Sequence, residues 1–317
     1  MEVMVYLCIV TSILGNGTSS VFGGFYNRGS AGKKGASALY NLLIVVTVFI
    51  GWIFSFLRNN QLDWSIALPY AVPYGICYGV ATVATIYALK GPILLTTLFL
   101  RFSSLIVTFY GFAVGWPGKT PTVWTWLALA LIVLTIWLCL YTGKTNTKPS
   151  DANLQEIDAK TKKDGGRYEN KANFKWLICV LIVVLGNVGC SVFLQEQQLK
   201  YDGKYGDFFM IIAMSVAVAV CFVLYLRSDK SESKEIFKKV GIFPIVAGIV
   251  NVLQNSATLY LIAPERGLPL STLYAVLGVC GLMVTTLFSA FIFKEKMRWW
   301  QWIGVAVGMV ATAILSM

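Results

Sequence analysis

One charged side chain lies deep inside an apolar stretch of this sequence. Arg101 lies midway along residues 92–115, which are otherwise apolar or small. In hydrocarbon, an ionised group costs at least about 2.5 kcal/mol unless it meets water or a partner. Two interpretations follow. Either Arg101 faces a water-filled cavity and binds an anionic group of a solute, such as a carboxylate or phosphate, or it pairs with helix-end carbonyls or with Glu196.

Two pairs of small polar residues recur in similar apolar surroundings. Asn16 and Ser20 are four residues apart, and so are Asn187 and Ser191. Residues at this spacing share one face of a helix. The two pairs either line a cavity from opposite sides or form hydrogen bonds between helices, which is a common use of small polar residues in membrane bundles.

A longer polar stripe lies in the apolar stretch 241–263, where its members recur every three or four residues. They therefore share one helix face, which lipid would solvate poorly, and we predict that this face lines a cavity. The stripe consists of Asn251, Gln254, Asn255 and Thr258. Matching positions of the earlier stretch 65–89 include Tyr78 and Thr82, and Tyr274 lies in a later stretch. Tyr78 and Tyr274 could contact a ligand or serve as packing residues.

Glu196 ends the apolar stretch that begins at residue 174. Together with three flanking glutamines, it predicts a helix end in water or, alternatively, a gate at the mouth of a cavity. The glutamines are Gln195, Gln197 and Gln198.

The sequence lacks the residues that several kinds of chemistry usually require. The sequence contains no histidine, and no aspartate or glutamate lies near the middle of an apolar stretch. A buried carboxylate proton relay, a metal site and an acid–base enzyme site are therefore not expected, and no cofactor is predicted. The cysteines lack the spacing of a disulfide framework or a zinc site, and we interpret them as packing residues. They are Cys8, Cys77, Cys139, Cys179, Cys190, Cys221 and Cys280.

Composition places the chain in a membrane. Of its 317 residues, 57% are hydrophobic and only 13% are charged, and the mean hydropathy is +0.69. Soluble globular domains do not have this composition. Apolar runs of about 18–25 residues recur along the chain, and each could cross about 30 Å of hydrocarbon as a helix. The 26 Lys and Arg lie almost entirely in the loops between these runs, so the net charge of +11 predicts membrane orientation rather than nucleic-acid binding.

We predict an all-α membrane protein with ten transmembrane helices. The predicted spans are residues 3–25, 36–57, 65–89, 92–115, 122–141, 174–196, 207–226, 241–263, 268–293 and 299–317. The chain then divides into a first five-helix unit, residues 1–141, and a second five-helix unit, residues 174–317. Between them, residues 142–173 are polar and almost free of aromatic residues, which is typical of a flexible linker.

Short motifs indicate that the two units are copies of one another. Leu14-Gly-Asn16 returns as Leu185-Gly-Asn187, and Ala84-Thr-Ile-Tyr87 returns as Ala257-Thr-Leu-Tyr260. A Trp-x-Trp motif likewise begins the fifth and the tenth span. Because each copy has an odd number of spans, the second copy enters the membrane from the opposite side, which predicts inverted repeats. Inverted repeats are typical of secondary transporters, whose substrate site lies near the membrane midplane.

This organisation resembles the drug/metabolite transporter superfamily, and in particular its EamA-type members. The sharpest local match is Phe293-Lys-Glu-Lys-Met-Arg-Trp-Trp-Gln-Trp-Ile-Gly304, which is similar to that family's glutamate followed by Gln-Trp-x-Gly at the entry to the last helix. The first copy has no glutamate in the corresponding Gly115-Trp-Pro-Gly-Lys-Thr120. The resemblance implies a ten-helix transporter of small molecules in the plasma or inner membrane.

The loops predict an orientation that differs from the one that the resemblance implies. Most Lys and Arg lie in the linker and in the loops on its side of the membrane, including Arg28, Lys33 and Lys34. The positive-inside rule then puts the linker inside and both termini outside. Many members of the superfamily are expected to have a cytoplasmic N-terminus instead.

The leading hypothesis is a secondary-type transporter that moves a small polar, anion-bearing metabolite by alternating access between the repeats, with Arg101 as its anchor. The alternative is an exporter of amphipathic or cationic drugs, and Arg101 would repel a cation. A non-transporting scaffold or receptor and a membrane enzyme are further alternatives. The expected partners are the solute and the lipid bilayer. Gly-x-x-x-Gly faces such as Gly75 to Gly79 could serve a homodimer or internal packing.

Overall fold

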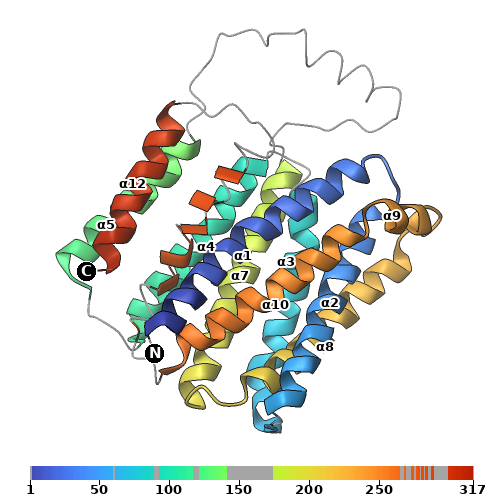
Figure 1. Ribbon diagram of the computed structural model, residues 1–317, viewed down its shortest axis with the longest axis horizontal. Coiled ribbons are helices and arrows are strands. Elements are labelled where there is room, and N and C mark those ends of the chain that lie inside the picture. The colour runs from blue at the N-terminus through green and yellow to red at the C-terminus, as the bar shows by residue number, and fades with distance from the viewer. Residues whose placement is uncertain are drawn as a thin grey trace.

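The computed structural model of this protein is built of helices, and no strand occurs among the residues that it describes (Figure 1). These residues are 2–59, 61–88, 93–116, 121–140, 174–264 and 299–316, with 268, 273–274, 276–278, 280–281, 283–284 and 287–288 between the last two ranges. The predicted linker 142–173 and much of the predicted span 268–293 lie outside them.

Each half of the chain contributes a series of long helices joined by short connections. The first half contains α1 (Glu2–Gly29), α2 (Ala36–Asn59), η1 (Trp64–Ile66), η2 (Ala67–Ala71), α3 (Val72–Ala88), α4 (Ile93–Val114) and α5 (Val123–Leu140). The second half contains α7 (Phe174–Lys200), α8 (Gly206–Arg227), α9 (Ser233–Val240), α10 (Ile242–Ile262) and α12 (Trp299–Ser316).

Within the described part of the chain, six helical segments are long and apolar enough to cross a membrane. They are Val3–Gly29, Ala36–Arg58, Trp64–Ala88, Phe174–Lys200, Gly206–Arg227 and Ile242–Ile262. Shorter apolar helices lie within α4, α5 and α12. The chain is therefore an all-helical, multi-pass membrane protein, as the sequence predicted. The count of ten spans and their inverted arrangement stay predictions.

The stretch after α8 differs from the prediction of a loop. Eight residues, Ser233–Val240, form the short helix α9. Its apolar side chains Ile236 and Val240 are buried in the same cluster as Tyr26 of α1 and Tyr40 of α2. The loop prediction was wrong because this helix is short and rich in charge, so it lacks the long apolar period by which the membrane helices were recognised.

The start of α3 is irregular, as the prolines there predict. The turn η1 and the π-helical turn η2, which contains Pro69, precede the regular helix. Proline has no N–H to donate, and its ring clashes with a carbonyl of the preceding α-helical turn. The wider π turn avoids that clash, and π turns are frequent at functional sites. Regular α-helix therefore begins only at Val72, inside the apolar segment Trp64–Ala88.

Helices of the two halves pack against one another in matched pairs. α1 packs on α10, α3 packs on α7, α2 packs on α8, and α5 packs on α12 at one edge of the bundle (Figure 1). In addition, α3 contacts α8, and α10 contacts α2. We match α1, α2, α3 and α5 of the first half with α7, α8, α10 and α12 of the second. The contact of α1 with α10 then corresponds to that of α7 with α3, and the contact of α3 with α8 corresponds to that of α10 with α2. The contacts of α2 with α8 and of α5 with α12 each correspond to themselves.

Glycines at two of these helix crossings repeat the same pattern. A Cβ on Gly15 would lie 2.8 Å from Cβ of Gln254, and a Cβ on Gly186 would lie 2.8 Å from Cβ of Ala81. The two glycines belong to the repeated Leu-Gly-Asn motif. Ala81 and Gln254 each precede the repeated Ala-Thr-x-Tyr motif by three residues. At both crossings, the glycine of the Leu-Gly-Asn motif has no side chain and so allows the two helices to approach closely.

The contacts of α3 with α8 and of α10 with α2 show a second close approach. Gly75 packs against the backbone carbonyl of Ala213, and Gly248 of α10 packs against the carbonyl of Ile44 in α2. Gly79 also faces α8. The Gly75 to Gly79 face therefore packs inside the chain, which is one of the two uses that the sequence left open.

Some large apolar side chains are buried in a core, and others are exposed on the outside of the bundle. Trp52, Phe209 and Met210 are at most 1% exposed and belong to one buried cluster. Leu68 and Leu185, by contrast, are 80% and 66% exposed. A soluble protein rarely exposes so much apolar surface, whereas lipid solvates it well.

Candidate functional site

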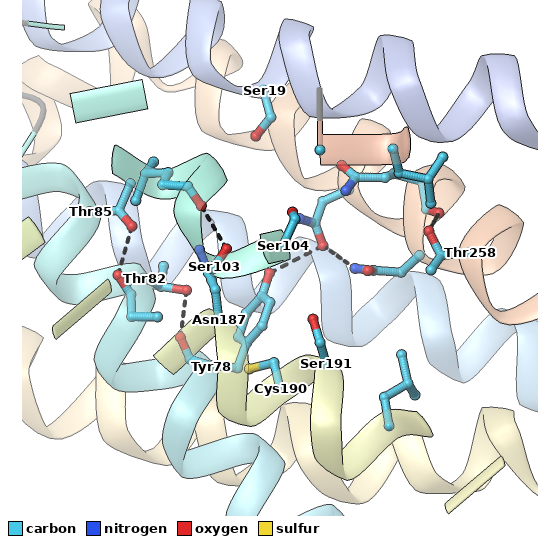
Figure 2. Close-up of a pocket in the computed structure, with 18 of the residues that line it drawn as sticks. Ser19, Tyr78, Thr82, Thr85, Ser103, Ser104, Asn187, Cys190, Ser191 and Thr258 are labelled. Atoms are coloured by element: carbon cyan, nitrogen blue, oxygen red, sulfur yellow. Dashed lines mark hydrogen bonds between the residues drawn. The ribbon is translucent and has the colours of Figure 1, made fainter. Parts of the chain in front are cut away.

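A polar cavity of about 290 Å³ lies among helices of both halves (Figure 2). α3 and α4 line it from the first half, α7 and α10 line it from the second, and α1 and α2 contribute single polar residues. The polar lining consists of Ser19, Tyr40, Tyr74, Tyr78, Thr82, Thr85, Ser103, Ser104, Asn187, Ser191, Asn251, Gln254, Asn255, Thr258 and Tyr274. None of the described lining residues is charged. The described part of the cavity wall is thus polar and uncharged within an apolar bundle.

The structure brings many of the candidate residues from the sequence together in this lining. They are Tyr78, Thr82, Asn187, Ser191, Asn251, Gln254, Asn255 and Tyr274. Asn16 and Ser20 lie in α1, but their side chains are outside the described part of the structure. The side chain of Arg101 is outside it as well, although its backbone lies in α4 next to the lining residue Leu100.

A hydrogen-bonded trio joins the two halves in the wall of the cavity. The Tyr78 hydroxyl of α3 donates to Oδ1 of Asn251 in α10 over 3.1 Å. Nδ2 of Asn255 donates to the same oxygen over 2.8 Å. Asn251 Oδ1 therefore uses both of its lone pairs, while the amide nitrogen of Asn251 keeps its N–H groups for other partners. Tyr78 and Asn251 each lie six residues before a copy of the Ala-Thr-x-Tyr motif, so equivalent positions of the two halves meet here.

Hydroxyl groups in the lining donate their protons to the helix backbone (Figure 2). Thr82 and Thr85 each donate to the carbonyl four residues earlier, over 2.8 and 2.7 Å. Ser103 donates to the carbonyl three residues earlier over 2.6 Å, and Thr258 donates to the carbonyl four residues earlier over 2.9 Å. A hydroxyl has a single proton, so the oxygens of Thr82, Thr85 and Ser103 can only accept further hydrogen bonds. The Thr258 oxygen also lies 3.2 Å from the Ser12 hydroxyl.

Part of the described lining therefore presents hydrogen-bond acceptors that have no proton left to donate. Tyr78 and Tyr274 also donate their only proton within the protein, to Asn251 and to Gln195. The N–H donors that remain belong to amides, such as those of Asn187 and Asn251. A solute that is rich in O–H donors would satisfy this wall better than a solute that has only acceptors, because unpaired buried polar groups weaken binding.

Sequence reasoning missed several hydroxyls of the lining. They are Ser19, Thr85, Ser103 and Ser104. Thr85 continues the helix face of Tyr78 and Thr82 at helical spacing, so the period alone could have revealed it. Ser103 and its neighbour follow Arg101 within the same span, where the charge dominated the interpretation. No pattern in the sequence distinguishes Ser19 from the other small polar residues of its helix.

A cluster of aromatic and amide side chains lies next to Tyr274. Its hydroxyl donates to Oε1 of Gln195 over 3.3 Å, and its ring lies 6.2 Å from the ring of Trp116. Nε1 of Trp116 in turn donates to Oε1 of Glu196 over 2.8 Å. Glu196 therefore contacts the first half at the edge of this cluster and is not part of the described cavity lining. Its role as a gate stays a prediction.

The end of α7 differs from the predicted helix end in water. Gln195, Gln197 and Gln198 are at most 1% exposed. Nε2 of Gln197 donates to the carbonyl of Lys204 over 2.8 Å, and Nε2 of Gln198 donates to Gln197 over 2.6 Å. α7 continues to Lys200, and the turn that follows it covers these amides. The prediction was wrong because polar residues were assumed to mark the membrane surface, whereas here they hydrogen-bond inside the fold.

Comparisons with known proteins add a distant relative. No family model matches the sequence. The curated "Putative ribose uptake protein RbsU" of Lactobacillus johnsonii is 24% identical over 188 residues, which cover 58% of this chain and 55% of that protein. The chain thus matches about half the length of this relative. The name of the relative describes a transporter.

A solved crystal structure is similar in its overall arrangement. It superimposes with a TM-score of 0.63 over 98% of this chain and 95% of that chain, at 13% sequence identity. At this identity the likeness concerns the fold alone, since one fold supports many functions.

Proposed function

We propose that this protein is a membrane transporter that carries a small, neutral, polyhydroxylated solute through the cavity between α3, α7 and α10. The observation that carries the proposal is the hydrogen-bonding character of the wall. The described lining has no charge, and the hydroxyls of Thr82, Thr85 and Ser103 donate to the backbone. Such a wall accepts hydrogen bonds, and a sugar-like solute donates several.

The size of the cavity also favours a small metabolite. Its volume of about 290 Å³ lies just below the range of ~300–1,000 Å³ for small-molecule pockets. An amphipathic or cationic drug, the alternative substrate class, would need more room or a carboxylate partner. The described lining residues include no carboxylate.

The distant relative supports the same class of solute. It is named for the uptake of ribose, which is neutral and has several hydroxyl donors. D-Ribose is therefore a suitable first probe for this cavity.

The transport mechanism that we propose is alternating access between two inverted five-helix repeats. The reciprocal packing of α1 on α10 and α3 on α7 supports it, as do the matched contacts of Gly15 and Gly186. The hydrogen bond from Tyr78 to Asn251 joins equivalent positions, as is expected at a twofold axis between repeats. Secondary transporters bind their solutes near such an axis. The arrangement also fits the resemblance to EamA-type transporters in a cell membrane.

An anion-bearing metabolite is the second candidate, and the position of Arg101 favours it. Arg101 lies in α4 between the lining residues Leu100 and Ser103. A guanidinium near a cavity would bind a carboxylate or phosphate well. The hydroxyls of Thr82, Thr85 and Ser103 oppose such a solute, since they can only accept hydrogen bonds from it and carboxylate and phosphate oxygens are themselves acceptors. The neutral solute therefore ranks first.

A thermal-shift measurement on the purified protein separates these candidates. Because a ligand that binds only the folded state stabilises it by mass action, each probe is read as a change in Tm. The probes are D-ribose, D-ribose 5-phosphate and tetraphenylphosphonium, tested on the wild type and on Arg101→Gln. The proposal predicts that D-ribose raises Tm in both proteins and that the phosphate raises it in neither.

Other outcomes have distinct meanings. Stabilisation by D-ribose 5-phosphate that disappears in Arg101→Gln would establish the anion-bearing solute instead. Stabilisation by tetraphenylphosphonium alone would favour drug export. If no probe changes Tm at concentrations up to tens of millimolar, the proposed solute class is wrong.

A non-transporting scaffold is tested by access to the cavity. In a background with the native cysteines replaced by alanine, since Cys190 also lines the cavity, Asn255→Cys should react with a membrane-impermeant thiol reagent. D-Ribose should slow that reaction. A thiol that stays unreactive from both sides of a sealed vesicle would favour a closed bundle without transport.

A further inference from the structure

Gln195 has an unusual environment beside the proposed solute site. It lies in α7, one turn after the lining residue Ser191, and its side chain is fully buried. Oε1 of Gln195 accepts the proton of the Tyr274 hydroxyl over 3.3 Å. Nε2 of Gln195 is buried and has no hydrogen-bond partner among the residues that the structure describes. A buried amide that makes one such bond and leaves its own donor unpaired is costly, which calls for a reason beyond packing.

The geometry links this amide to the cavity through Tyr274. Tyr274 is itself buried and lines the cavity, and Gln195 is the hydrogen-bond partner of its hydroxyl among the described residues. A phenol has one proton and two lone pairs. Once the proton is donated to Gln195, the Tyr274 oxygen can only accept a hydrogen bond from a solute.

We propose that Gln195 is a positioning residue that fixes Tyr274 as a hydrogen-bond acceptor, and that this pair selects solutes with a hydroxyl donor at the matching position. The inference rests on the proposed function, because it concerns the solute that the cavity binds. Without the Gln195 oxygen, the Tyr274 hydroxyl would be free to rotate and donate. The cavity would then also accept solutes that present an acceptor at that point.

The neighbouring glutamine provides a matched control. Gln197 is equally buried in the same helix, but its Nε2 donates to the carbonyl of Lys204 in the turn after α7, whereas the Tyr274 hydroxyl donates to Gln195. Gln197→Met should therefore lower stability without changing how the cavity recognises hydroxyl groups. Gln195→Met should change the recognition.

The test compares D-ribose with its monodeoxy analogues, using Kd values measured by isothermal titration on the purified full chain. In the wild type, the analogue that lacks the hydroxyl paired with Tyr274 should bind about tenfold more weakly than D-ribose. In Tyr274→Phe and in Gln195→Met, the ratio of the Kd of this analogue to the Kd of D-ribose should fall to about twofold. In the double variant the ratio should fall no further. Gln195→Glu retains oxygens that accept from Tyr274, so it should keep most of the wild-type ratio.

Four results would contradict the proposed role of Gln195. If Gln195→Met weakens D-ribose and all analogues by the same factor, as Gln197→Met could, Gln195 acts only on folding. If Gln195→Met keeps the tenfold ratio of Kd values while Tyr274→Phe loses it, Tyr274 recognises the solute hydroxyl without being positioned by Gln195. If the wild type binds D-ribose but shows no ratio that depends on Tyr274, the inference fails while the proposed function stands. If the wild type binds none of these sugars, both are wrong.

Discussion

Two of the contacts that join the first and second halves of the chain lie in very different surroundings. In the cavity, Tyr78 of α3 meets Asn251 of α10 through a bond between uncharged groups that are both partly buried. At one end of the bundle, Lys33 in the turn between α1 and α2 meets Glu232 and Glu235 of the α9 region, at 3.4 and 2.7 Å. We call these contacts the cavity pair and the loop clasp.

The difference between the two follows from the medium around them. The Lys33 and Glu235 side chains of the loop clasp are 27% and 63% exposed, so water and salt screen their attraction. The cavity pair lies among apolar helices, where a broken hydrogen bond leaves a polar group without water to replace the lost partner. Of these two contacts, the charged one lies at the surface and the neutral one lies inside the bundle. Substitutions should therefore have large effects in the cavity and small effects at the clasp.

The largest effect is expected from removing the centre of the cavity pair. Asn251→Leu takes away the acceptor of both Tyr78 and Asn255. Two donors then lack partners, at a cost of roughly 1–3 kcal/mol each. The Kd for D-ribose should rise about 100-fold, measured by isothermal titration. Asn251→Asp keeps the accepting oxygen and should cost less. Equal affinity in Asn251→Leu and the wild type would contradict the importance of this pair.

Helix packing beside the cavity pair should be the next most sensitive feature. Gly75 packs directly against the carbonyl of Ala213, so even the added Cβ of Gly75→Ala must move α3 away from α8. Overpacking of this kind costs roughly 1–3 kcal/mol, which a fall in Tm would report. Gly79→Ala is the matched control, because its Cβ would lie 3.3 Å from the nearest atom, a side-chain carbon of Val220. The account predicts a much smaller fall in Tm for Gly79→Ala.

Trimming one member of the cavity pair should have an intermediate effect. Tyr78→Phe removes the hydroxyl, but Asn251 still accepts from Asn255 over 2.8 Å. A single neutral hydrogen bond contributes about 0.5–1.5 kcal/mol, so the Kd for D-ribose should rise roughly three- to tenfold. A loss as large as that of Asn251→Leu would show that the Tyr78 hydroxyl contacts the solute itself.

The smallest effect is expected at the loop clasp. The hydrogen bond to Glu235 raises the pKa of Lys33, and the same bond lowers the pKa of Glu235. The stabilising contribution of Glu235 is thus present above the pKa of a free glutamate and is lost as pH falls through its lowered value. That of Lys33 is present below the pKa of a free lysine and is lost as pH rises through its raised value. At neutral pH both are present.

The corresponding measurement compares Tm for the wild type and Lys33→Ala. At neutral pH and low salt the variant should melt slightly earlier, and the difference should vanish in 1 M NaCl or in strong acid. D-Ribose affinity should not change. A large, salt-independent fall in Tm would mean that the clasp is as important as the cavity pair.

The sequence predicted the parts of this structure that depend on hydrophobicity and missed those that depend on local partners. Long apolar runs gave the membrane helices to within a few residues, because length and apolar content alone decide whether a helix can span lipid. α9 was missed because its stability comes from Ile236 and Val240 packing on α1 and α2, which no local period reveals. The duplicated motifs predicted two inverted copies, which stays a prediction, and they did not indicate which side chains would meet.

The candidate site shows the same division. A polar stripe on an apolar helix indicated that Asn251 and Asn255 lie on one helix face, because lipid rejects such a face. The direction of each hydrogen bond was out of reach, since it depends on which carbonyl or amide lies opposite. The glutamines that flank Glu196 were interpreted as a helix end in water, whereas Gln195 is buried and accepts a hydrogen bond from Tyr274. Partners of this kind are visible only in three dimensions.

The most direct test of the central claim is uptake of radiolabelled D-ribose into proteoliposomes that contain the wild type or Asn251→Leu. The account predicts saturable uptake by the wild type that excess unlabelled D-ribose abolishes and D-ribose 5-phosphate leaves unchanged, with little uptake by Asn251→Leu. Uptake that is equal in both proteins, or absent in a folded wild type, would contradict the assignment of this cavity to a neutral polyhydroxylated solute.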